Sequence, residues 1–157
     1  GIPGYPYNIV IIGGIFIALI CFSVIYRLRA LRKISMLSGI RAAALYRNCV
    51  IVCICVIAIT SIFLSIPLSI SHKHLAMILC ILIAFAGAIY IAVAWFCINF
   101  ALARVSGVGI FETYVWLCVI LFPLNALYHL IFPITLTITS IVHLLAWSKI
   151  EKISVKV

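Results

Sequence analysis

Long apolar runs alternate with short polar segments along the whole chain. Residues 8–26, 48–71 and 75–100 contain no lysine, arginine or acidic residue. Each run can cross a bilayer, because about 20 apolar residues rising about 1.5 Å each span its hydrocarbon core of roughly 30 Å. With two further apolar runs, at 105–122 and 126–147, the pattern predicts five transmembrane helices.

The end of the chain allows two interpretations. From Thr113 to Trp147 it stays apolar for too long to form one perpendicular crossing, and Pro123 and Pro133 interrupt it. We expect two passes that turn around Pro123, Leu124 and Asn125. The alternative is four crossings, with the segment from Glu112 to Phe122 re-entrant or interfacial.

Positive charge at two places sets the expected orientation. The basic loop, residues 27–47, holds six cations that we take as topology-determining, namely Arg27, Arg29, Arg32, Lys33, Arg41 and Arg47. The tail, residues 148–157, is also basic. Short loops rich in lysine and arginine stay on the cytoplasmic side. Five crossings place loop and tail on that side, or on the matrix or stromal side of an organelle, with the N-terminus outside.

Apolar residues recur every third position within the basic loop, at Leu28, Leu31, Ile34, Leu37 and Ile40. This spacing is roughly helical. It indicates either a surface helix or an extension of the first span, with a break expected at Ser38-Gly39.

Composition supports a single membrane domain over residues 1–157, an all-α polytopic integral membrane helix bundle. The chain is 68% apolar and 8% charged, whereas soluble domains are about 45–50% apolar and about 25% charged. The net charge of +9 sits at the ends of apolar runs, which favours contact with anionic lipids and argues against nucleic acid as a partner.

Small residues mark one candidate packing face. Ala84, Ala88 and Ala92 recur every fourth position within the third apolar run. Small residues at this spacing let helix backbones approach closely, and packing drives helix association in lipid. We expect a close helix contact here, within the chain or with another membrane subunit.

Ionisable residues inside apolar segments are costly in lipid and are therefore candidates for function. Arg104, Glu112 and His129 form a possible ion or proton path. His129 and His143, about 21 Å apart on one helix, have the depth separation of two haem ligands, but no other span offers the partner histidines. We therefore predict bound lipids but no cofactor.

No catalytic or metal-binding motif accompanies these residues. The seven cysteines lie in or beside apolar runs and lack the spacing of a zinc or redox site, so we interpret them as small packing residues. With no catalytic residue set and no metal site, the sequence disfavours an enzyme. We expect a non-catalytic subunit of a larger membrane protein complex. The alternative is a small oligomeric channel or transporter that uses the Arg104, Glu112 and His129 path.

Overall fold

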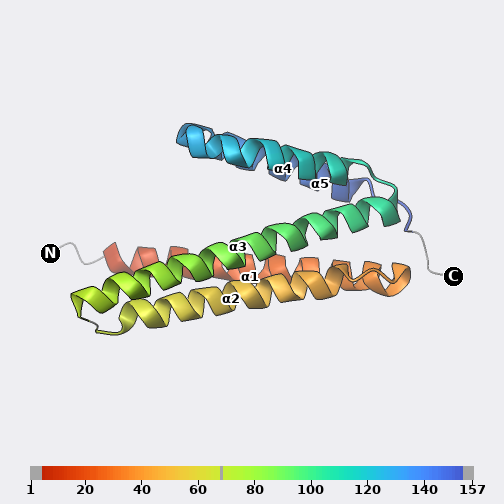
Figure 1. The fold of residues 1–157 in the computed structure, drawn as a ribbon. Helices are drawn as coiled ribbons and strands as arrows, with labels where there is room; N and C mark the ends of the chain where they lie inside the picture. The colour runs from red at the N-terminus through yellow and green to blue at the C-terminus, as the bar shows by residue number, and fades with distance from the viewer. Residues whose placement is uncertain (1–4, 68, 154–157) are drawn as a thin grey trace.

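The computed structural model describes residues 5–67 and 69–153, with side chains at all of these except 5–7, 70 and 71. Over the described residues it is an all-α bundle, and five of its segments are long and apolar enough to cross a membrane. The predicted fold class is therefore confirmed (Figure 1). The elements are α1 (Tyr5–Ser38), α2 (Ala42–Ser65), α3 (Ile70–Ser106), α4 (Ile110–Leu127), the 3-10 turn η1 (His129–Ile131) and α5 (Phe132–Ser148).

Helix α1 carries the first apolar run and most of the basic loop in one continuous helix of 34 residues. It ends where Gly39 adopts the left-handed conformation, at φ 74°, and donates its N–H to the Ser35 carbonyl. Glycine adopts this conformation without steric cost, which makes it a common helix terminator. The predicted break at Ser38-Gly39 is confirmed, and the basic segment extends the first span.

Ser35 joins α1 to α2. Its hydroxyl oxygen accepts a hydrogen bond of 3.1 Å from the Ala43 N–H, one of the donors that the first turn of α2 cannot satisfy internally. The turn between the two helices is thereby held from the α1 side.

The last two helices begin later than the sequence predicts. Helix α3 continues to Ser106 and ends at Gly107, whose φ is 70°, so α4 starts at Ile110 and not at residue 105. Pro123 lies inside α4, and the expected turn around Pro123 to Asn125 is wrong, since the chain turns at Tyr128. Pro133 lies in the first turn of α5, where its missing N–H costs no hydrogen bond.

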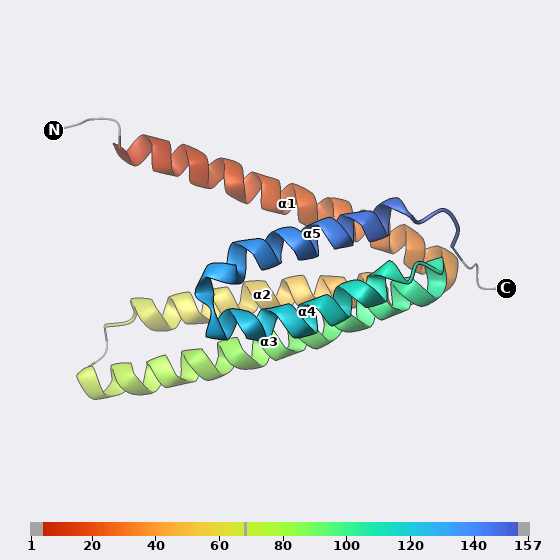
Figure 2. The same cartoon turned by 90° about the horizontal axis from the view of Figure 1, so that it is seen from above.

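The helices form two antiparallel hairpins and a leading helix. Figure 1 shows the α4–α5 hairpin leaving the end of α3 and diverging from the α2–α3 hairpin. Seen from above, α1 diverges toward its N-terminus, and the tip of α4–α5 stops short of the α2–α3 connection (Figure 2). The α2–α3 pair has the most extensive contact of any two helices.

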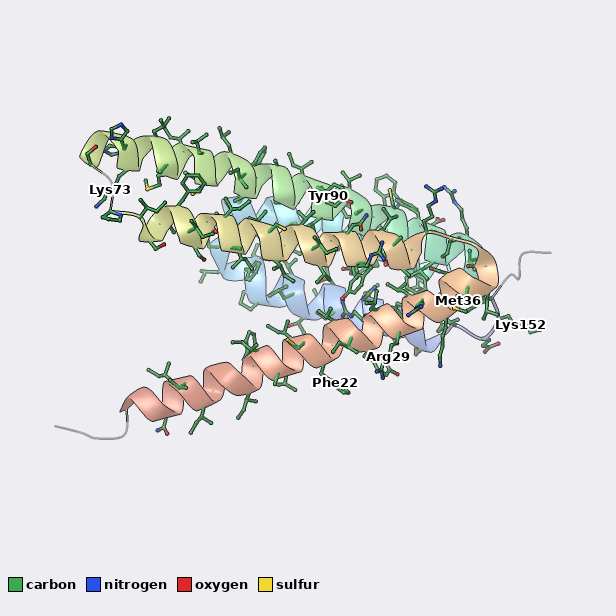
Figure 3. All side chains as sticks on the ribbon, turned by 90° about the horizontal axis from the view of Figure 1, so that it is seen from below. Phe22, Arg29, Met36, Lys73, Tyr90 and Lys152 are labelled. Carbon is green, nitrogen blue, oxygen red and sulfur yellow. The ribbon has the colours of Figure 1, made fainter. Side chains whose placement is uncertain are left out.

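Because the helices alternate in direction, the α1–α2 connection, the α3–α4 connection and the end of α5 share one end of the molecule. The cations gather there among the described residues, with Lys73 at the opposite end, and Figure 3 shows Lys152 and Met36 far from Lys73. Lys156 of the predicted basic tail lies outside the described part of the chain. We call this common end the basic end.

The buried core also lies toward the basic end. All five helices contribute to it, through Leu31, Ile34, Ala42, Tyr46, Ile98, Leu102, Ala103, Phe111 and Ala146. Away from this end the helices are mostly exposed, and none of residues 8–26 in α1 is buried. Burial of apolar surface is driven by water and not by lipid, which accounts for packing at the basic end and divergence elsewhere.

Candidate functional site

Aromatic and polar side chains from all five helices meet beside the core. We call this group the interfacial cluster. It consists of Arg27 on α1, Tyr46 on α2, Trp95 on α3, Tyr114 on α4, and His143 and Trp147 on α5.

Two indole N–H groups organise the cluster. Trp95 Nε1 donates to the Tyr114 hydroxyl at 3.0 Å, and Trp147 Nε1 donates to His143 Nε2 at 3.3 Å. An indole nitrogen can only donate, so His143 Nε2 must accept. His143 is therefore a neutral imidazole that carries its proton on Nδ1.

Aromatic rings enclose His143, which is 5% exposed. Its ring centroid lies 4.5 Å from that of Tyr114, 5.3 Å from that of Trp95 and 6.1 Å from that of Phe111. These separations fall in the range where aromatic pairs attract each other beyond simple area burial. The imidazole thus ties α5 to α3 and α4.

Arg27 provides the charge of the cluster. Its Cζ lies 5.8 Å from the centroid of the Trp95 ring, within the distance of a cation–π interaction. The side chain is half-buried, whereas Arg29, Arg32 and Lys33 on the same helix are exposed.

Asn99 lies one helical turn beyond Trp95 and is fully buried. Its Nδ2 donates to the Trp95 carbonyl at 2.8 Å, while its Oδ1 has no hydrogen-bond partner among the described residues. A buried amide oxygen without a donor costs free energy.

A second polar contact holds the α4–α5 hairpin near its tip. Thr135 Oγ1 donates to Asn125 Oδ1 at 3.1 Å, and both residues are buried. Asn125 belongs to the predicted turn, but the structure places it inside α4, facing α5.

The predicted packing face lies outward. Ala84, Ala88 and Ala92 are all exposed, and Ala88 and Ala92 line an open groove of about 500 Å³ between α3 and α4. The close approach within the chain is made instead by Gly87, where an added Cβ would lie 2.8 Å from Val56 Cγ2 on α2. The alanine face is thus available to another chain.

The residues of the possible ion path are not brought together. Arg104, near the end of α3, and Glu112, in the first turn of α4, are exposed at the basic end. His129 is exposed in η1, at the opposite end of α4. Fifteen residues of α4, 113–127, follow Glu112 before the helix ends, which correspond to about 22 Å of helix.

Sequence reasoning singled out Arg27 for topology and paired His143 with His129 as possible haem ligands. In the structure the two histidines do not share one α-helix. His129 lies in the 3-10 turn His129–Ile131, and His143 lies in α5, which begins only at Phe132. Tyr46, Tyr114 and Trp147 were not predicted. The available signal was the enrichment of tyrosine and tryptophan at membrane boundaries, read together with the nearby cations.

The interfacial cluster combines a fixed cation, neutral hydrogen-bond donors and aromatic rings, without a carboxylate. Over residues 5–67 and 69–153, no three His, Cys, Asp or Glu side chains lie close enough together to hold a metal ion.

Comparisons with protein-family models, with curated proteins and with solved structures found no match for this chain.

Proposed function

We propose that this chain is a non-catalytic integral membrane subunit that packs against other subunits in a larger membrane protein complex. The observation that carries the proposal is the groove between α3 and α4. Its α3 wall is lined by Ala88, Ile91, Ala92, Trp95 and Phe96, with the two alanines the smallest of these side chains, and its α4 wall by Tyr114, Cys118 and Phe122. Lipid-facing positions gain nothing from small side chains, whereas a partner helix gains close packing from them.

Helix α1 supports the same proposal. Its residues 8–23 are exposed except for half-buried Gly13, and α1 diverges from the other helices (Figure 2). Added Cβ atoms at Gly13 and Gly14 would meet nothing within 4 Å. A helix of a partner subunit would find a second close-packing position at this glycine pair.

The orientation is part of the proposal. The shared position of the basic connection and the start of the tail at one end of the molecule fits the positive-inside rule. We assign that end to the cytoplasm, or to the matrix or stroma, and the N-terminus to the outside.

A channel or transporter through Arg104, Glu112 and His129 has less support. The three side chains are exposed at two ends of the molecule, and a path would need further groups from other chains.

Replacing Ala88 with leucine tests the subunit proposal. Leucine would project into the α3–α4 groove and keep a partner helix away, so the complex should be lost. Ala86→Leu is the matched control, because Ala86 is exposed on the same helix but does not line the groove. Native electrophoresis of mild-detergent extracts, with identification of co-purifying proteins, measures the outcome.

We expect wild type and Ala86→Leu to migrate in a large complex and Ala88→Leu to migrate alone. Migration of the wild-type chain alone, or of all three proteins in the same complex, would contradict the proposal.

A further inference from the structure

A groove of about 510 Å³ runs between α1 and α5 beside the interfacial cluster. Arg27 and Ser23 line it from α1, and His143, Leu144, Trp147 and Ser148 line it from α5. Figure 2 shows α1 and α5 diverging away from the basic end.

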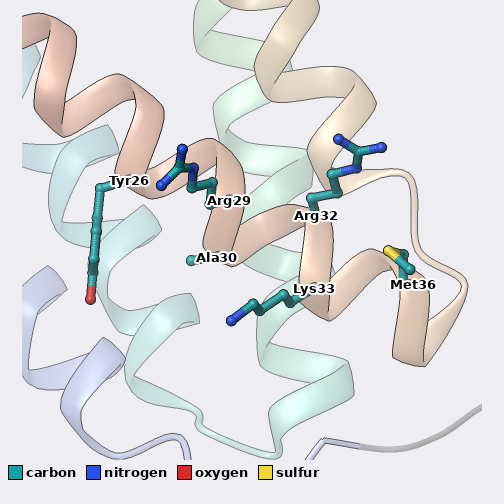
Figure 4. Close-up of a pocket in the computed structure, with 6 residues that line it drawn as sticks. All are labelled: Tyr26, Arg29, Ala30, Arg32, Lys33 and Met36. Carbon is teal, nitrogen blue, oxygen red and sulfur yellow. The ribbon is translucent and has the colours of Figure 1, made fainter.

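The groove carries positive charge without a counter-ion from the chain. None of its lining residues is acidic, and the only two acids of the sequence are Glu112 and Glu151. A neighbouring hollow shares Tyr26 and Ala30 with the groove (Figure 4). That hollow adds Arg29, Arg32 and Lys33 on α1, of which Arg29 and Arg32 also line a separate hollow toward α2.

A half-buried guanidinium is stabilised by an anion that accepts its hydrogen bonds. Arginine presents a planar fork of donors that matches phosphate oxygens. The Ser23 hydroxyl is a second potential donor at the groove wall.

The depth of the groove selects the kind of anion. Arg27 follows 19 residues without charge, from Asn8 to Tyr26, which correspond to about 28 Å of helix. This length matches the hydrocarbon thickness, so Arg27 lies where lipid phosphates lie. Phe22, next to Ser23 on α1, and Ile141, two residues before His143 on α5, are exposed apolar side chains.

We infer that the groove between α1 and α5 binds an anionic glycerophospholipid, with the lipid phosphate on Arg27 and the acyl chains along the diverging faces of α1 and α5. This site is separate from the α3–α4 groove of the proposed function. Its failure and the failure of the subunit proposal are therefore distinguishable.

Tryptophan quenching by brominated lipids tests the inference. Trp147 lines the groove, whereas Trp95 lines the separate α3–α4 groove and Trp116 is exposed elsewhere on α4. The full chain with Trp95→Phe and Trp116→Phe, which keeps Trp147 as the single reporter, is placed in micelles with brominated phosphatidylglycerol or brominated phosphatidylcholine. We expect brominated phosphatidylglycerol to quench the tryptophan fluorescence at a lower lipid concentration than brominated phosphatidylcholine. Arg27→Gln should reduce the ratio of the two half-quenching concentrations about tenfold.

Two variants complete the test. Arg41→Gln removes an equal charge from the basic end at a residue that does not line the groove, and it should keep the preference. Ala30→Leu narrows the groove and keeps every charge, so it should lower the preference and decides the matter if Arg27→Gln does not fold.

Equal quenching by the two lipids in the reporter protein that keeps Arg27 and Ala30 would overturn the inference. A preference for phosphatidylglycerol that survives both Arg27→Gln and Ala30→Leu would overturn it as well. Inorganic phosphate at matched ionic strength distinguishes the source of the phosphate. Loss of the preference on adding it would assign the site to a free anion and not to a lipid.

Discussion

Two buried amides show how this chain handles polar groups at the residue scale. Asn99 and Asn125 each leave one side-chain atom without a hydrogen-bond partner among the described residues. Asn125 nevertheless accepts a hydrogen bond from Thr135 on the facing helix, whereas Asn99 bonds only to its own helix. The Thr135–Asn125 hydrogen bond therefore joins two helices, whereas the Asn99 hydrogen bond lies within α3 and joins no other helix to it.

Thr135→Val should destabilise the chain, because the isosteric side chain leaves Asn125 Oδ1 without its donor. We expect a loss of about 1 to 2 kcal/mol in the free energy of unfolding. Titration with a denaturing detergent, followed by circular dichroism, measures it.

Thr137→Val is the control for this change. Thr137 is exposed and bonds only to the Pro133 carbonyl one turn back in its own helix. Equal losses for the two variants would show that the contact between α4 and α5 contributes nothing.

At the scale of helices, contact depends on how closely two backbones can approach. Gly87 faces Val56 across the α2–α3 pair, which is the most extensive helix contact of the fold. Gly13 and Gly14 on α1 face nothing within 4 Å. Gly87 thus allows a close contact between two helices of the chain, whereas Gly13 and Gly14 make no such contact, although all three lie in apolar runs.

Gly87→Leu should force α2 and α3 apart, since valine is branched at Cβ and cannot easily move aside in a helix. Overpacking of this kind costs about 1 to 3 kcal/mol. Gly14→Leu adds the same side chain in open space and should gain up to about 1 kcal/mol from helix propensity. The same unfolding titration on the isolated chain compares them, and a Gly87→Leu protein as stable as Gly14→Leu would refute the close contact.

The whole molecule is organised by one end. The basic connection, the start of the tail, the buried core and the interfacial cluster all lie at the basic end, while the helices diverge from it. Away from the basic end, contact continues where helices pair closely, as at Gly87 and Val56 between α2 and α3 and at Asn125 and Thr135 between α4 and α5.

This arrangement predicts the accessibility of single cysteines introduced into a variant without native cysteines. Met36→Cys and Lys152→Cys, at the basic end, should react with an impermeant maleimide from the same side of sealed vesicles (Figure 3). His74→Cys, exposed in the first turns of α3, should react only from the other side. Labelling of residues 36 and 152 from opposite sides would contradict the five-pass layout.

The sequence by itself determined the class of protein, the number of apolar helices and the break at Gly39. These features depend on local quantities, namely the length of an apolar run, the placement of cations and the left-handed conformation that glycine allows. The boundaries of α4 and α5 could not be predicted from the sequence, because a proline can lie inside a membrane helix or mark its end.

Only the tertiary structure decided which side of each helix meets another helix. In lipid an apolar side chain has a similar solvation free energy whether it faces a neighbouring helix or the acyl chains, so hydrophobic periodicity does not mark the face that packs inward. For this reason the sequence pointed to Ala84, Ala88 and Ala92, while the fold uses Gly87 for its closest contact. The same freedom hid the interfacial cluster, whose six residues come from five helices and meet only when those helices pack.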